Sequence, residues 1–143
     1  MKTLHFTAAA AALLLGACTA MQPANPALGG SWQDIGTSPN GNVSHAIDTA
    51  SIRSQNHGAT FRERVTVREP AKEHYINTPH YKSAVNEWQM DCRARTYRLL
   101  GVQMFDTAGK LLTAHRYTHL RAQPVVKGSA SGNQFEKVCR QAL

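Results

Sequence analysis

The sequence of 143 residues lacks the motifs that mark the common enzyme classes. It has no nucleophile elbow, no paired histidine and glutamate zinc motif and no glycine-rich phosphate loop of the recognised spacing. It also lacks a recognisable nucleic-acid-binding module, and no residue pattern calls for a cofactor. We therefore expect a protein that is not an enzyme, needs no cofactor and does not bind nucleic acid.

Acidic residues are scarce. There are 9 aspartates and glutamates against 16 lysines and arginines, which gives a formal net charge of +7. A protein with this excess of cations is attracted to acidic lipids, acidic polysaccharides and acidic protein surfaces. The alternative is a cationic surface without a specific partner.

Long apolar runs are also missing, apart from residues 8–15 near the start. With Lys2 before it, this run predicts a signal peptide over residues 1–17, because it is too short to cross a membrane as a helix. The following residues, Leu15-Gly16-Ala17-Cys18, resemble the lipobox of bacterial lipoproteins, in which the cysteine is acylated. The alternative is an ordinary secretory cleavage site. By that resemblance, Thr19 after the cysteine favours the outer membrane over the inner one.

Only three cysteines are present, and an acylated Cys18 would leave two that can pair in an oxidising compartment. Residues 84–92 alternate between apolar and polar side chains, which is typical of a half-buried strand and points Cys92 into the core. The strand pattern resumes at Leu99 and ends at the turn sequence 106–110, so we expect a long antiparallel hairpin here.

The last residues of the chain predict a short helix. Ser131 and Gln134 have the spacing of a capping box. Four residues at helical spacing then share one face: Phe135, Val138, Cys139 and Ala142. Because so short a helix is marginal alone in water, we predict that a Cys92–Cys139 disulfide holds it on a sheet.

The rest of the chain divides into a tether over residues 18–30, with prolines and glycines that pack poorly, and one domain over residues 31–143. Short strands are predicted at residues 32–35 and 43–48. Around Asp48 the sequence 47–52 predicts a tight turn and a return strand, and residues 55–58 predict a second turn. The fold class is therefore α+β, a single antiparallel sheet with a C-terminal helix docked on one face.

One predicted strand, within residues 59–70, carries an apolar face that Glu63 interrupts and an opposite face with three arginines. These are Arg62, Arg64 and Arg68. Three cations in a row are a candidate strip for acidic ligands. The alternative is an ordinary solvated sheet face.

Residues 70–82 show no periodicity and contain two prolines, so they predict a loop, the kind of segment that often carries function. Its candidate contact residues are Lys72, His74, Tyr75, His80, Tyr81 and Lys82. Tyrosine offers rigid, amphipathic contact area. The alternative is that the tyrosines only cover the edge of the sheet.

Two histidines, His115 and His119, invite a metal interpretation. On a strand, residues four apart lie about 13 Å from each other, too far to share one ion. We therefore expect no metal site.

Four pieces of the chain, taken in order, resemble the bacterial surface-adhesin protein E family. They are AIDTASI (46–52), YKSAVNEWQMDC (81–92), MFDTAGK (104–110) and FEKVCRQ (135–141). The resemblance spans residues 32–139. It implies an outer-membrane lipoprotein whose domain is an antiparallel sheet of about six strands, with a C-terminal helix held on one face by a disulfide.

The resemblance also implies adhesion to host extracellular matrix proteins such as vitronectin and laminin, and it allows for a homodimer. Two hypotheses follow. The first is a surface-exposed adhesin or binding module anchored in the outer membrane by its N-terminal lipid. The second is a periplasm-facing envelope lipoprotein with a structural or accessory role. We favour the first.

Overall fold

The computed structural model describes residues 25–143. The predicted signal peptide, the predicted lipidation of Cys18 and most of the predicted tether lie outside these residues. Within residues 25–143 no helix has the length and apolar character needed to cross a membrane.

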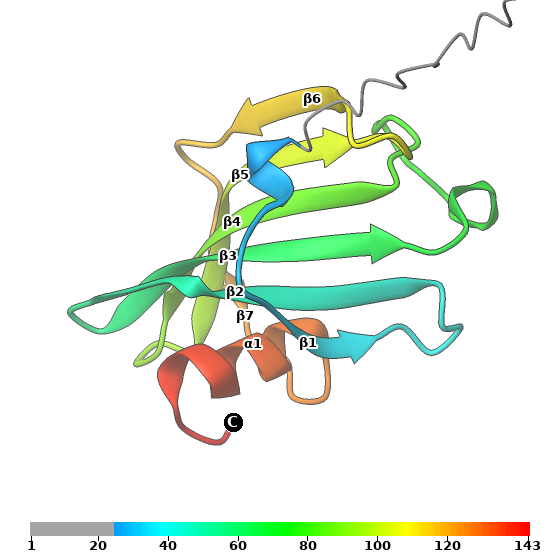
Figure 1. Cartoon of the computed structure of the whole chain (residues 1–143). Coiled ribbons are helices and arrows are strands. Elements are labelled where there is room, and N and C mark those ends of the chain that lie inside the picture. The colour runs from blue at the N-terminus through cyan, green and yellow to red at the C-terminus, as the bar shows by residue number, and fades with distance from the viewer. Residues whose placement is uncertain (1–24) are drawn as a thin grey trace, which may run out of the picture.

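A single antiparallel sheet, curled along its length, forms the body of the domain (Figure 1). Six strands follow one another across it in chain order: β1 (Trp32–Thr37), β2 (Val43–Gln55), β3 (Gly58–Val67), β4 (Ser83–Asp91), β5 (Thr96–Phe105) and β6 (Leu111–Arg116). The two-residue strand β7 (Gln123–Pro124) pairs with the start of β5. Helix α1 (Ala130–Cys139) follows near the C-terminus, and short 3-10 turns occupy Pro26–Leu28 (η1) and Pro70–Lys72 (η2). The predicted fold class is confirmed.

The main core lies between α1 and one face of the first strands. Along β3 every second side chain from Ala59 to Val67 is buried, as the period-two pattern predicted. Helix α1 contacts β1, β2 and β3. Its Phe135 is completely buried and packs in a cluster with Ile47, Phe61 and Met90. Burial of these four apolar side chains drives the helix onto the sheet.

A disulfide joins Cys92 to Cys139, with the two Cα atoms 5.6 Å apart. Cys92 lies in the turn just after β4 rather than inside the strand, and Cys139 is the last residue of α1. The bond therefore ties the end of the helix to the β4–β5 turn. The predicted pairing is confirmed.

The turn predicted at Asp48 is wrong. The chain does not reverse there, because β2 continues to Gln55, and only the pairing with β3 shifts register between Asp48 and Arg53. The turn chemistry is present locally: a side-chain oxygen of Asp48 accepts from the backbone N–H of Ala50, and the Ser51 hydroxyl donates to the Asp48 carbonyl. These bonds make an irregularity within one long strand.

The predicted start of the helix is also wrong by two residues. The N-cap is Ser129, whose hydroxyl accepts from the N–H of Gly132, whereas Ser131 is buried in the first turn and its hydroxyl accepts from the N–H of Val126. Ala142 lies beyond the helix because Arg140 adopts a left-handed conformation that ends it.

Candidate functional site

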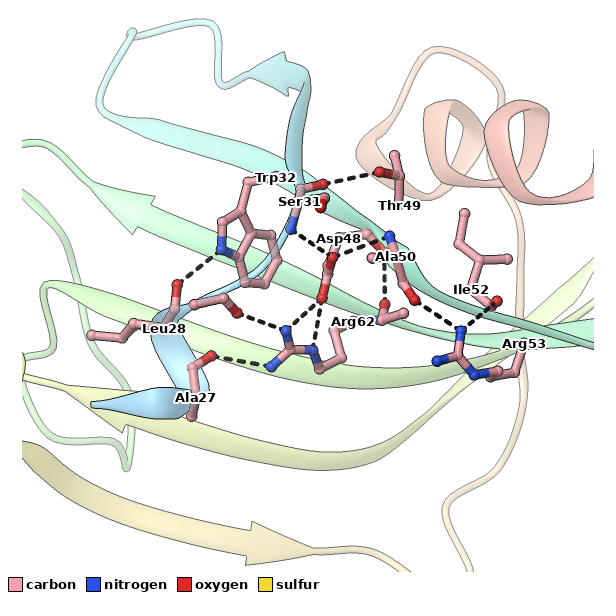
Figure 2. A network of polar contacts seen from close by, with 12 residues as sticks. Ala27, Leu28, Ser31, Trp32, Asp48, Thr49, Ala50, Ile52, Arg53 and Arg62 are labelled. Carbon is pink, nitrogen blue, oxygen red and sulfur yellow. Dashed lines mark hydrogen bonds and ion pairs between the residues drawn. The ribbon is translucent and has the colours of Figure 1, made fainter. Parts of the chain in front are cut away.

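Arg62, on the arginine face of β3, is occupied by contacts within the domain (Figure 2). Arg62 donates to one oxygen of Asp48 from both Nε, at 3.1 Å, and Nη2. The same guanidinium donates to the carbonyl oxygens of Ala27 at 3.2 Å and Gly29 at 2.7 Å. Arg62 therefore fastens the N-terminal segment to the sheet.

Asp48 is the acceptor at the centre of this network, and it is only 2% exposed. Its other oxygen accepts from the backbone N–H groups of Ser31 and Ala50, at 2.9 and 3.2 Å. The backbone passes so close that a Cβ at Gly30 would lie 2.8 Å from the Asp48 carboxylate. Burial alone would raise the pKa of Asp48, but the hydrogen bond from Arg62, those N–H donors and the Arg62 charge hold it below its ordinary 3.8.

Trp32 continues the same network. Its indole N–H donates to the carbonyl of Leu28 at 2.9 Å. The guanidinium carbons of Arg62 and Arg64 lie 5.3 and 4.8 Å from its ring centroid, which is cation–π distance. Of the three arginines predicted as a ligand strip, two are half-buried against Trp32 and only Arg68 is exposed.

Glu63 interrupts the apolar face of β3 for a structural reason. Its buried carboxylate accepts from His45 Nδ1 at 2.8 Å, from the amide of Asn86 at 3.0 Å and from the indole of Trp88 at 2.7 Å. Three donors compensate the cost of burying this charged group. The hydrogen bonds of Glu63 therefore link β2, β3 and β4.

The loop over residues 70–82, here called the tyrosine loop, joins β3 to β4 and folds on itself. The hydroxyl of Tyr75 donates to the carbonyl of Tyr81 at 2.7 Å, and its ring stacks on His80 with centroids 4.7 Å apart. Burial raises the pKa of both tyrosines above the ordinary 10.0, so Tyr75 stays a donor at neutral pH. The two tyrosines hold the loop, and His74 and His80 are exposed on it.

The base of the tyrosine loop is fixed by Asn42. Its amide donates to the side chain of Glu73 at 2.6 Å and to the carbonyl of Glu69 at 3.2 Å, and its oxygen accepts from the N–H of Glu69 at 2.8 Å. Lys82 reaches back to the carbonyl of Arg68 at 2.7 Å. The start of the connection is therefore tied to the residue before β2, and its two ends are tied to each other.

Ile76, in the middle of this loop, is the functional candidate that the sequence reasoning missed. Its side chain is 69% exposed, more than any other large apolar side chain in residues 25–143. The next residue, Asn77, has a left-handed backbone with φ of 55°. The sequence signal that could have identified Ile76 is a single isoleucine within a loop that is otherwise mostly polar.

Cations accompany Ile76 on the same loop. Lys72 pairs with Glu69 at 2.8 Å, and its hydrogen bond lowers the pKa of that exposed carboxyl. Arg68 comes just before the loop, after the end of β3, and Lys82 is the last residue of the loop. The loop therefore presents an exposed apolar side chain together with basic and histidine side chains.

His115 and His119 do not come together on one strand. His115 lies on β6 with its ring 4.4 Å from that of Tyr117, and His119 follows after the strand has ended. Across residues 25–143 no group of three or more histidine, cysteine or acidic side chains could hold a metal ion.

One comparison with known proteins gave a match. The family model described as surface-adhesin protein E matches residues 32–140, most of the chain. No curated protein and no solved structure matches the chain significantly.

Proposed function

Because the chain belongs to the surface-adhesin protein E family, we propose that it is an adhesin-type binding module for host extracellular matrix proteins such as vitronectin and laminin. The family suggests a bacterial surface protein that binds host partners without catalysis. In this proposal a lipid on Cys18 anchors the domain in the outer membrane, facing outward.

The observation that carries the proposal is the exposed Ile76 on an internally bonded loop. Protein interfaces typically have an apolar anchor at the centre and a polar rim. Leaving an isoleucine in water gains nothing for the fold, whereas burying it against a partner is favourable.

The order of the tyrosine loop lowers the cost of binding. A loop that is already held by the Tyr75 hydroxyl, the Tyr75–His80 stack and Asn42 loses little conformational freedom when a partner covers it. The basic residues Arg68, Lys72 and Lys82 would steer acidic partners toward the loop. We therefore centre the proposed binding surface on residues 68–82 and place Arg64 at its margin. Arg62 has a structural role, because it bonds Asp48 and the N-terminal segment.

Replacing Ile76 with serine is expected to weaken binding to vitronectin or laminin by about tenfold, because truncating an interface anchor typically costs about 1.4 kcal/mol or more. Thermal unfolding should be nearly unchanged, since Ile76 is 69% exposed in the free protein. The matched control is Val126→Ser, which removes another exposed apolar side chain, 56% exposed, from the segment before α1. Titration calorimetry at physiological salt measures the affinity of both variants.

The Val126 variant should bind as the wild type does. Unchanged binding by the Ile76 variant, or an equal loss in both variants, would remove the tyrosine loop as the contact surface.

A further inference from the structure

A second exposed feature lies at the opposite end of β3 from the tyrosine loop. An open hollow of about 750 Å³ is bordered by the turn between β2 and β3, the turn after β4 and the end of α1. The Cys92–Cys139 disulfide forms part of its wall. In Figure 1 this is the side of the sheet where the β2–β3 hairpin projects beside the helix.

The charge of the hollow is of one sign. Arg93, Arg95 and Arg140 line it, together with His57, and no aspartate or glutamate does. All three arginines are exposed, and none of their guanidinium groups takes part in the ion pairs or hydrogen bonds found within residues 25–143. The nearest acid in sequence, Asp91, uses one oxygen to cap the turn by accepting from the N–H groups of Arg93 and Ala94.

Two of these arginines occupy backbone positions that suit other residues better. Arg95 and Arg140 have φ values of 55° and 53°. A left-handed backbone is unfavourable for a residue with a Cβ, and glycine or asparagine is the usual residue at such a position. The helix dipole favours a cation at Arg140, but no such reason applies to Arg95.

The disulfide positions the arginines relative to one another. Cys92 precedes Arg93 and Cys139 precedes Arg140, and the cysteine Cα atoms are 5.6 Å apart. The covalent bond therefore holds arginines from two distant segments on one wall of the hollow. Exposed guanidinium groups gathered in this way can donate paired hydrogen bonds to the oxygen atoms of sulfate groups.

We propose that this arginine hollow binds a sulfated polysaccharide. The rest of its lining is mainly polar, with amides from Gln55, Asn56 and Gln141 that can bond sugar hydroxyls. It offers little apolar surface for the acyl chain of a lipid or the side chains of a peptide. The site is separate from the tyrosine loop and does not depend on it.

The test uses the full chain purified in a non-ionic detergent and a fluorescent heparin oligosaccharide as the probe, with anisotropy read at about 0.15 M salt. The triple variant Arg93→Gln, Arg95→Gln, Arg140→Gln should bind at least about tenfold more weakly. The control triple Lys110→Gln, Arg121→Gln, Lys127→Gln removes the same charge from exposed sites outside the hollow and should lose less than about twofold.

A second variant separates binding from folding. Arg95→Gly with Arg140→Gly relieves the left-handed backbone, so it should unfold at a higher temperature and still bind the oligosaccharide more weakly. Equal losses in the two triple variants, equal binding of desulfated heparin, or displacement of the probe by detergent micelles that contain phosphatidylglycerol would each overturn the proposal.

Discussion

The Cys92→Ala, Cys139→Ala double variant is expected to have a free energy of unfolding about 4 kcal/mol below that of the wild type. The disulfide joins positions 47 residues apart, and opening so long a loop restores much conformational freedom to the unfolded chain. The loss also loosens α1, which is too short to persist without docking. Urea denaturation under non-reducing conditions measures the difference.

Reductant provides the control for this experiment. With the disulfide reduced, the wild type should unfold close to the double variant, because both then lack the cross-link. A loss below about 1 kcal/mol under non-reducing conditions would show that apolar docking of Phe135 is sufficient to hold the helix.

The Asp48→Ala variant is expected to lose about 3 kcal/mol of unfolding free energy at neutral pH. The substitution leaves Arg62 half-buried without its carboxylate and leaves the N–H groups of Ser31 and Ala50 without their acceptor. The N-terminal segment should detach from the sheet. Asp34→Ala, which removes an exposed carboxylate from β1, should change stability by less than about 0.5 kcal/mol.

The pH dependence of this effect has a definite sign. Because the folded pKa of Asp48 lies below its ordinary 3.8, its contribution is fully present above that pH and is lost as the pH falls through the depressed value. Denaturation curves of the wild type and the Asp48 variant should therefore converge in acid. A difference that stays constant from neutral pH into acid would contradict the assigned role of this carboxylate.

Local patterns in the sequence predicted the sheet and its cross-link. Alternation along residues 59–67 identified β3, and the two cysteines on a strand end and a helix face identified the disulfide. Both features follow from side-chain periodicity, which is a property of neighbouring residues.

Competing local signals explain the two wrong assignments. Asp48 does make turn-like hydrogen bonds, but pairing with β3 on both sides of the irregularity keeps β2 extended. Both Ser129 and Ser131 are residues of a type that can cap a helix. Ser131 is buried in the first turn, where its hydroxyl bonds the N–H of Val126, so Ser129 is the N-cap. Contacts between distant segments determine where a strand or helix begins and ends, and the spacing of neighbouring residues in the sequence does not reveal these contacts.

The candidate site was only partly predictable for the same reason. The sequence identified the arginine strand and the tyrosine loop, but it could not show that Arg62 is engaged by Asp48, which lies in another strand. It also could not separate the tyrosines, which hold the loop, from Ile76, which faces water.

Binding of vitronectin and laminin to intact cells, with and without this protein, tests the central proposal most directly. The measurement is made at physiological salt, before and after brief treatment with an external protease. We predict saturable binding that requires the protein and disappears when the protease removes it from the surface. Binding that is the same in cells lacking the protein, together with protection of the protein from the protease, would contradict the account and favour a periplasm-facing accessory role.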